Sequence, residues 1–143
     1  MRPSVNRGFT LLEVIVAMMV AGILLALALP RFASARDAHA VRGAMDVLAA
    51  EFSLARQTAL ARRAPVAVVF DTAEGVVRTR AAAGPIRLSD LSGSFGVTIA
   101  ANRDSAVYDP RGFGYGLSNL TVVVHRGNFV DTLTMSRLGR VRW

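Results

Sequence analysis

The sequence of 143 residues contains no cysteine and no lysine, and it has only two histidines. Without cysteine, the chain can form no disulfide, no thiolate metal site and no cysteine nucleophile. His39 and His125 are too few for a metal site with three histidine ligands. The length suits one domain rather than two. With 52% hydrophobic residues, the sequence is neither disordered nor of low complexity.

Charge is scarce near the N-terminus, where Glu13 is the single charged residue in the largely apolar run of residues 9–29. A run of this length matches a helix that crosses a bilayer core about 30 Å thick. Arg2 and Arg7 precede the run and no acidic residue does. Because positive charges favour the cytoplasmic side, we expect a single-pass membrane protein with a cytoplasmic N-terminus and the rest of the chain on the other side of the membrane.

Three kinds of N-terminal segment compete for this run. A cleaved secretory signal has a small-x-small site at residues 26–28, but its apolar region would be too long and would contain a carboxylate. A plain membrane anchor offers Glu13 no partner, although a carboxylate in an apolar span is costly. Cleavage between Gly8 and Phe9 would give Glu13 a charged partner, because the new α-amino group of Phe9 is a cation.

The hexapeptide Gly-Phe-Thr-Leu-Leu-Glu at residues 8–13 resembles the class III signal of type IV pilins and type II secretion pseudopilins. The resemblance implies that prepilin peptidase cleaves after Gly8 and methylates the new N-terminus at Phe9. It also implies that Glu13 guides docking of the subunit into a growing filament. Pro30 matches the proline at which the pilin helix loosens, and proline lacks the N–H that a helix interior needs.

After Pro30 the apolar residues recur at steps of three and four, which predicts an amphipathic helix with one apolar stripe. The helix should end near Arg63, because Pro65 disfavours a helical conformation at the residue before it. Together with residues 9–29 it forms a helix of about 55 residues, roughly 80 Å long. The stripe consists of Val41, Met45, Leu48, Phe52, Ala55 and Ala59.

From residue 65 onward, short β-branched runs separated by turns predict antiparallel strands. Because this part alone would form a modest core, we expect the helix stripe to be buried against the sheet. The predicted fold is therefore α+β, and the pilin resemblance implies a lollipop: leader 1–8, transmembrane helix 9–29, amphipathic periplasmic helix 30–64 and β-rich head 65–143. The expected strands are residues 65–70, 76–81, 86–88, 97–101, 106–108, 120–125, 129–136 and 140–143.

The sequence does not indicate an enzyme. No Gly-x-Ser-x-Gly or His-Glu-x-x-His motif is present, and the two histidines are far apart in sequence. The seven Asp and three Glu are scattered, which is typical of solvated surface. Residues 112–116 contain spaced glycines but lack the strand-to-helix context of a phosphate loop. We therefore expect no cofactor, and no carboxylates are clustered for a metal ion.

Arginine is the residue type that most suggests binding. In a final strand Arg140 and Arg142 would point to one face, with Arg126 and Arg137 in turns nearby in sequence. Guanidinium groups gathered at one end of a sheet bind phosphates well, so a DNA-binding site is one interpretation. The alternative is a solvated edge that discourages pairing with another sheet. Trp143, on the other face of that strand, is expected to fill the core.

Within the pilin group, the head resembles the GspH/FimT type through the Asp-Pro-Arg-Gly turn at residues 109–112 and the ending Gly-Arg-Val-Arg at residues 139–142. The resemblance implies a minor pseudopilin of the type II secretion system, with other pseudopilins, prepilin peptidase, the inner membrane and secreted cargo as partners. It also leaves open a minor pilin of a type IV pilus that captures DNA for natural transformation, since the Gly-Arg-x-Arg ending matches the motif assigned to that role.

Overall fold

The computed structural model describes residues 9–115 and 119–143, together with the backbone but not the side chain of Pro30. The chain divides into two compact units, Met1–Ala35 and Arg36–Trp143. Helix α1 (Leu11–Arg62) contributes to both units.

In the first unit, α1 begins with a cap from Thr10. The Thr10 hydroxyl accepts a hydrogen bond from the Glu13 backbone N–H at 3.2 Å, and this satisfies a donor that the helix itself leaves free. Glu13 lies in the first turn, where its negative charge interacts favourably with the positive end of the helix dipole. This part of the helix is long and apolar enough to cross a membrane. Its backbone remains helical through Pro30, where the resemblance implied loosening.

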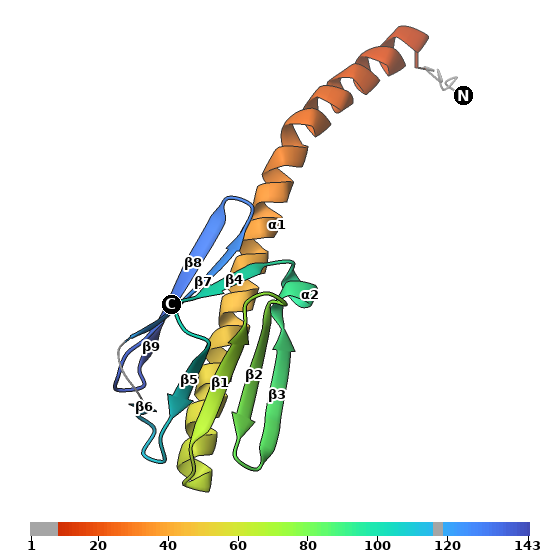
Figure 1. The fold of residues 1–143 in the computed structure, drawn as a ribbon. Helices are drawn as coiled ribbons and strands as arrows, with labels where there is room; N and C mark the ends of the chain where they lie inside the picture. The colour runs from red at the N-terminus through yellow and green to blue at the C-terminus, as the bar shows by residue number, and fades with distance from the viewer. Residues whose placement is uncertain (1–8, 116–118) are drawn as a thin grey trace, which may run out of the picture. The chain divides into compact units, whose positions relative to one another are not determined.

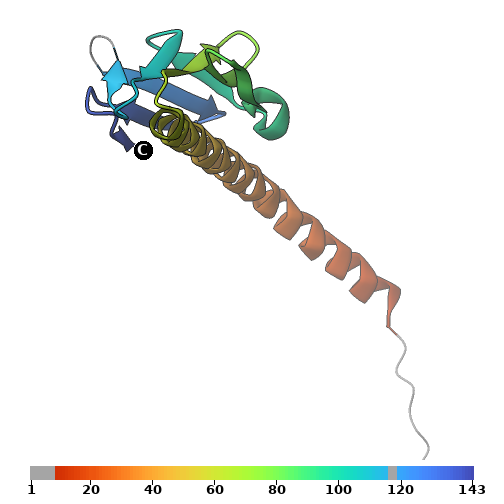
Figure 2. The same ribbon diagram turned by 90° about the horizontal axis from the view of Figure 1, so that it is seen from below.

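In the second unit, α1 buries one face against the β-structure (Figure 1). All six residues of the predicted stripe are buried, so the predicted periodicity is confirmed. Phe52 contacts Phe70 of the first strand, with ring centroids 6.0 Å apart, and thereby joins helix to sheet. Figure 2 shows this part of α1 running along one side of the strands.

The strands form two antiparallel sheets, each with one face toward α1. Burial alternates along the strands, so each sheet has one apolar face, which packs toward α1, and one more polar face exposed to solvent. The first sheet has the order β3 (Gly84–Asp90), β2 (Val76–Ala81), β1 (Val66–Asp71), β5 (Ser105–Tyr108) and β6 (Gly114–Tyr115). The second has the order β4 (Thr98–Ala101), β7 (Leu120–Arg126), β8 (Phe129–Met135) and β9 (Val141–Arg142).

The predicted α+β class is therefore confirmed, with two elements that the sequence did not predict. One is β6, a two-residue strand beside β5. The other is the short helix α2 (Leu91–Phe95), which forms because Asp90 caps its N-terminus and Gly96 ends it in a left-handed conformation. The expected strands at residues 65–70 and 76–81 correspond to β1 and β2, which pair as a hairpin whose turn is capped by Asp71. That backbone hydrogen bond from Glu74, together with Arg78, lowers the pKa of Asp71 below its usual value.

Candidate functional site

Of the residues that the sequence suggests for processing and docking, Phe9 and Glu13 lie near the start of α1. Gly8 is outside the residues that the structure describes. Phe9 is 82% exposed, and Glu13 is exposed as well. Within the described part of the chain, the Glu13 carboxylate forms no ion pair. The Glu13 carboxylate is therefore exposed near the start of α1 without an ionic partner among residues 9–115 and 119–143.

Arg140 directly precedes β9, the last strand of the second sheet, and Arg142 is the second residue of that strand. Arg142 lies opposite Thr134, which in turn lies opposite Thr121, so these three residues share the face of the sheet away from α1. Both arginines line a groove of about 420 Å³ on this face. They are exposed, and among the described residues neither forms an ion pair.

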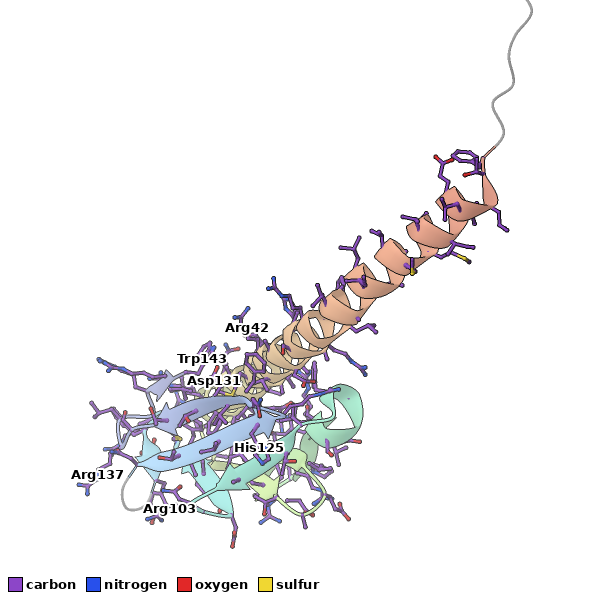
Figure 3. All side chains as sticks on the ribbon, turned by 90° about the horizontal axis from the view of Figure 1, so that it is seen from above. Arg42, Arg103, His125, Asp131, Arg137 and Trp143 are labelled. Atoms are coloured by element: carbon purple, nitrogen blue, oxygen red, sulfur yellow. The ribbon has the colours of Figure 1, made fainter. Side chains whose placement is uncertain are left out.

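Arg137 lies at the same end of the sheet, in the turn between β8 and β9. The turn is closed by the Gly139 N–H donating to the Ser136 carbonyl at 2.9 Å and by the Ser136 N–H donating to the Arg140 carbonyl at 2.8 Å. Figure 3 shows the Arg137 side chain extending away from the ribbon. The structure thus places Arg137, Arg140 and Arg142 at one end of the second sheet.

The base of this turn is fixed by Gly139 and Tyr108. Gly139 has a φ of 72°, a conformation that favours glycine, and its carbonyl accepts a hydrogen bond from the Tyr108 hydroxyl at 3.3 Å. Burial of Tyr108 raises its pKa to about 12, although the positive charge of Arg56 opposes the shift. Tyr108 therefore remains a neutral hydrogen-bond donor, and it holds the turn that carries Arg140.

Arg126 does not join the other arginines. It lies opposite Phe129, five residues along β8 from Thr134, the partner of Arg142. At about 3.4 Å per residue, these positions are about 17 Å apart. The expected gathering of four guanidinium groups at one end of the sheet is therefore not formed. Arg126 instead forms an ion pair with Asp37 of α1 at 2.8 Å.

Trp143 is 61% exposed, so the prediction that it fills the core is wrong. Phe52 and Tyr108 already fill the core beneath this end of the chain, and each is 1% exposed. Trp143 instead lies at the side of a groove that also includes Val141 and Arg56 of α1.

Sequence reasoning missed Glu51, which was expected to be a solvated acid and is fully buried. Its two carboxylate oxygens accept hydrogen bonds from the hydroxyls of Thr79 at 2.5 Å and Ser89 at 2.6 Å. The Arg87 side chain, 52% exposed, approaches the same carboxylate at 3.0 Å. A signal was present in the sequence, because residue 51 falls between Leu48 and Ala55 at the spacing of the apolar stripe. Glu51 thus joins α1 to β2 and β3.

The described residues contain no group of three or more His, Asp or Glu side chains placed to hold a metal ion. His39 is exposed on α1 and His125 is exposed on β7.

Comparison with known proteins adds to this geometry. The prokaryotic N-terminal methylation motif matches residues 3–29, and the type II transport protein GspH family matches residues 44–139. A crystal structure of the Pseudomonas aeruginosa (strain PAO1) type IV minor pilin FimU in space group P21 has a similar fold. Its TM-score is 0.61, with 17% sequence identity over 71% of this chain and 86% of that chain.

A second FimU crystal structure, in space group P65, has a TM-score of 0.59 and 18% identity over 71% of this chain and 90% of that chain. At such identities the likeness shows a shared fold. The sequence matches no curated protein. Because the GspH match covers more than half of the chain and the fold is that of a minor pilin, this protein belongs to the family of type II transport protein GspH.

Proposed function

We propose that this chain is a minor pseudopilin of a type II secretion system. In this proposal it is cleaved after Gly8, is held in the inner membrane by residues 9–29, and is assembled through α1 into a periplasmic pseudopilus. The observation that carries the proposal is the apolar, exposed first part of α1 with one carboxylate that lacks an ionic partner in its own described chain. The GspH match supports the choice of an export system.

The mechanism is mechanical rather than catalytic. The exposed apolar side chains of the first unit become buried when they pack against helices of neighbouring subunits. Glu13 would then pair with the amino group of Phe9 from its own or a neighbouring chain, because an unpaired carboxylate is costly in an apolar environment. The head, residues 65–143, would contact other subunits or exported cargo as the filament grows.

Removing the Glu13 carboxylate should block assembly. We expect Glu13→Ala to reduce the amount of this subunit in sheared filaments at least about tenfold, because a buried charge pair would lose one partner. The measurement is an immunoblot of filament and membrane fractions from cells that express the full-length variant. Cleavage after Gly8, seen as a change in length, should continue, since Glu13 lies beyond the cleaved bond.

Asp46→Ala is the matched control, because Asp46 is an exposed acid on the same helix within the second unit. It removes the same charge and should leave incorporation unchanged. Normal incorporation of Glu13→Ala would contradict the docking role.

A second function is favoured by a specific observation, the position of Arg137, Arg140 and Arg142. They are exposed at one end of the second sheet, and in the described chain none of them forms an ion pair. Such an end can hold the phosphates of DNA, as the head of a type IV pilus subunit that captures DNA for natural transformation would require.

If DNA is bound here, replacing Arg140 and Arg142 with alanine should weaken duplex binding by the detergent-solubilised full chain and make it less salt-dependent. The slope of log K against log salt should fall by about two, since about one counterion is released per phosphate contact. Fluorescence anisotropy of a labelled duplex across a salt series measures both.

The double variant Arg36→Ala and Arg80→Ala keeps the net charge of the test variant and removes exposed arginines from α1 and β2. It should bind almost as the unmodified chain does. Equal weakening in both variants would indicate a response to net charge alone, and absence of binding at low salt would leave export as the better account.

A further inference from the structure

Arg126 joins three elements of the second unit. Its Nε donates to the Asp37 Oδ1 of α1 at 2.8 Å, and its Nη1 donates to the backbone carbonyl of Phe95 at the end of α2. Arg126 itself ends β7, next to the turn that leads into β8. The turn between β7 and β8 lies beside α1 in Figure 1. One guanidinium therefore connects the helix, the short helix α2 and the β7–β8 hairpin.

Two glycines make room for these contacts. A Cβ at Gly96 would lie 2.9 Å from the Arg126 Nη1, and a Cβ at Gly127 would lie 2.8 Å from the Asp37 Oδ2. Both glycines have positive φ values, 63° and 56°, which other residues adopt at a cost. The backbone at Gly96 and Gly127 thus leaves room for the Arg126 guanidinium and the Asp37 carboxylate. The contact is therefore part of the folded structure and not an incidental surface ion pair.

The helical turn that carries Asp37 has little apolar attachment. Val41 is the first fully buried apolar side chain of α1, whereas Asp37, Ala38 and Ala40 are half-buried and Arg36 and His39 are exposed. The apolar core therefore holds α1 from Val41 onward, with only Ala40 of the preceding turn packed against it. N-terminal to that point, the ion pair of Asp37 with Arg126 is the polar contact that attaches the helix to the hairpin.

We infer that Asp37, Arg126 and the Phe95 carbonyl form a releasable clamp. The clamp determines whether residues 36–40 of α1 are attached to the β7–β8 hairpin or separated from it. When it is closed, residues 36–40 lie against the β7–β8 turn. When it opens, this turn of α1 separates from the hairpin while the core from Val41 onward stays packed. The freed surface of residues 36–40 then becomes available to a neighbouring helix in a filament.

Solvent access makes the clamp releasable. The side chains of Arg126 and Asp37 are 22% and 29% exposed, so water can replace each partner as the pair opens. The fully buried carboxylate of Glu51 has no such route. The inference goes beyond the proposed function, because it concerns the connection of helix and head in any machine that uses this chain.

The absence of cysteine allows a direct test. Cysteines introduced at His39 and Asn128, both exposed, carry nitroxide labels on α1 and on the hairpin of the full-length chain in detergent micelles. Pulsed electron paramagnetic resonance should give one narrow distance distribution in the unmodified background. Asp37→Asn and Arg126→Gln should add a longer-distance population, increasing the open fraction about tenfold, as expected for loss of a charge-assisted hydrogen bond.

Arg78→Gln is the control, since it removes an arginine that is paired with Asp71 and Glu74 elsewhere in the same unit. It should leave the distribution narrow. Circular dichroism reports whether each variant keeps its fold, and Asp37→Asn carries the test if Arg126→Gln unfolds, because it preserves the bond from Arg126 to Phe95. Identical distributions in Asp37→Asn and the unmodified chain would overturn the clamp, as would a broad distribution in the unmodified chain.

Discussion

Replacing Glu51 with alanine is expected to lower the free energy of unfolding of the head by about 3–5 kcal/mol. The carboxylate is fully buried and accepts hydrogen bonds from Thr79 and Ser89. Without it, two buried hydroxyls lose their acceptor, at about 1–3 kcal/mol each, and a cavity remains. Arg87 adds less to the loss, because its half-exposed side chain can return to water.

Urea unfolding of the detergent-solubilised chain, followed by circular dichroism, measures the change. Asp46→Ala, an exposed acid on the same helix, should change the free energy of unfolding by less than about 0.5 kcal/mol. A triple variant with Glu51→Leu, Thr79→Val and Ser89→Ala should recover part of the loss, since it removes donors and acceptor together. Equal stability of Glu51→Ala and Asp46→Ala would show that the buried network adds little.

Gly139→Val is expected to destabilise the head by about 3 kcal/mol and to displace the arginines that follow it. The new Cβ would lie 2.6 Å from the Gly112 carbonyl oxygen and 2.9 Å from Cε1 of Tyr108. The φ of 72° adds strain, because a β-branched residue rarely adopts it. Relief requires movement of the backbone between β8 and β9, which carries Arg140.

Thermal unfolding and duplex binding should therefore change together in Gly139→Val. Gly22→Val serves as the control, since a Cβ at Gly22 has no neighbour within 4 Å among the described residues. It should leave the unfolding of the head unchanged. If Gly139→Val unfolds at the temperature of the unmodified chain, the turn accommodates a side chain and Tyr108 does not fix it.

The helix and most strands could be predicted because their signals are local. A repeat at steps of three and four specified which face of α1 is buried, and all six stripe residues are buried as predicted. Turn residues delimited β1, β2, β7 and β8 to within a residue or two. Helix α2 was missed because Gly93 weakens the helical signal, and its formation depends on the cap that Asp90 provides.

The partners of charged residues could not be predicted in the same way. Arg126 is paired with Asp37, 89 positions earlier in the chain. Glu51 is bonded to Thr79 and Ser89 on two different strands. Such contacts depend on which strands the fold places against α1, and a single sequence contains no local signal for that. For the same reason, the exposure of Trp143 follows from how Phe52 and Tyr108 pack beneath it.

The second half of α1 supplies apolar surface to both sheets, and this bears on the order in which the head folds. The β1–β2–β3 meander and the β7–β8 hairpin are each formed by neighbouring strands, so their pairing requires only short loops to close. The two-stranded β7–β8 hairpin is at best marginally stable alone, and the inner apolar face of each piece is buried in the core that includes α1. Because α1 precedes every strand in the chain, its apolar face is synthesised before the β1–β2–β3 meander and the β7–β8 hairpin. We expect each of these pieces to dock on α1 in turn as the chain is made.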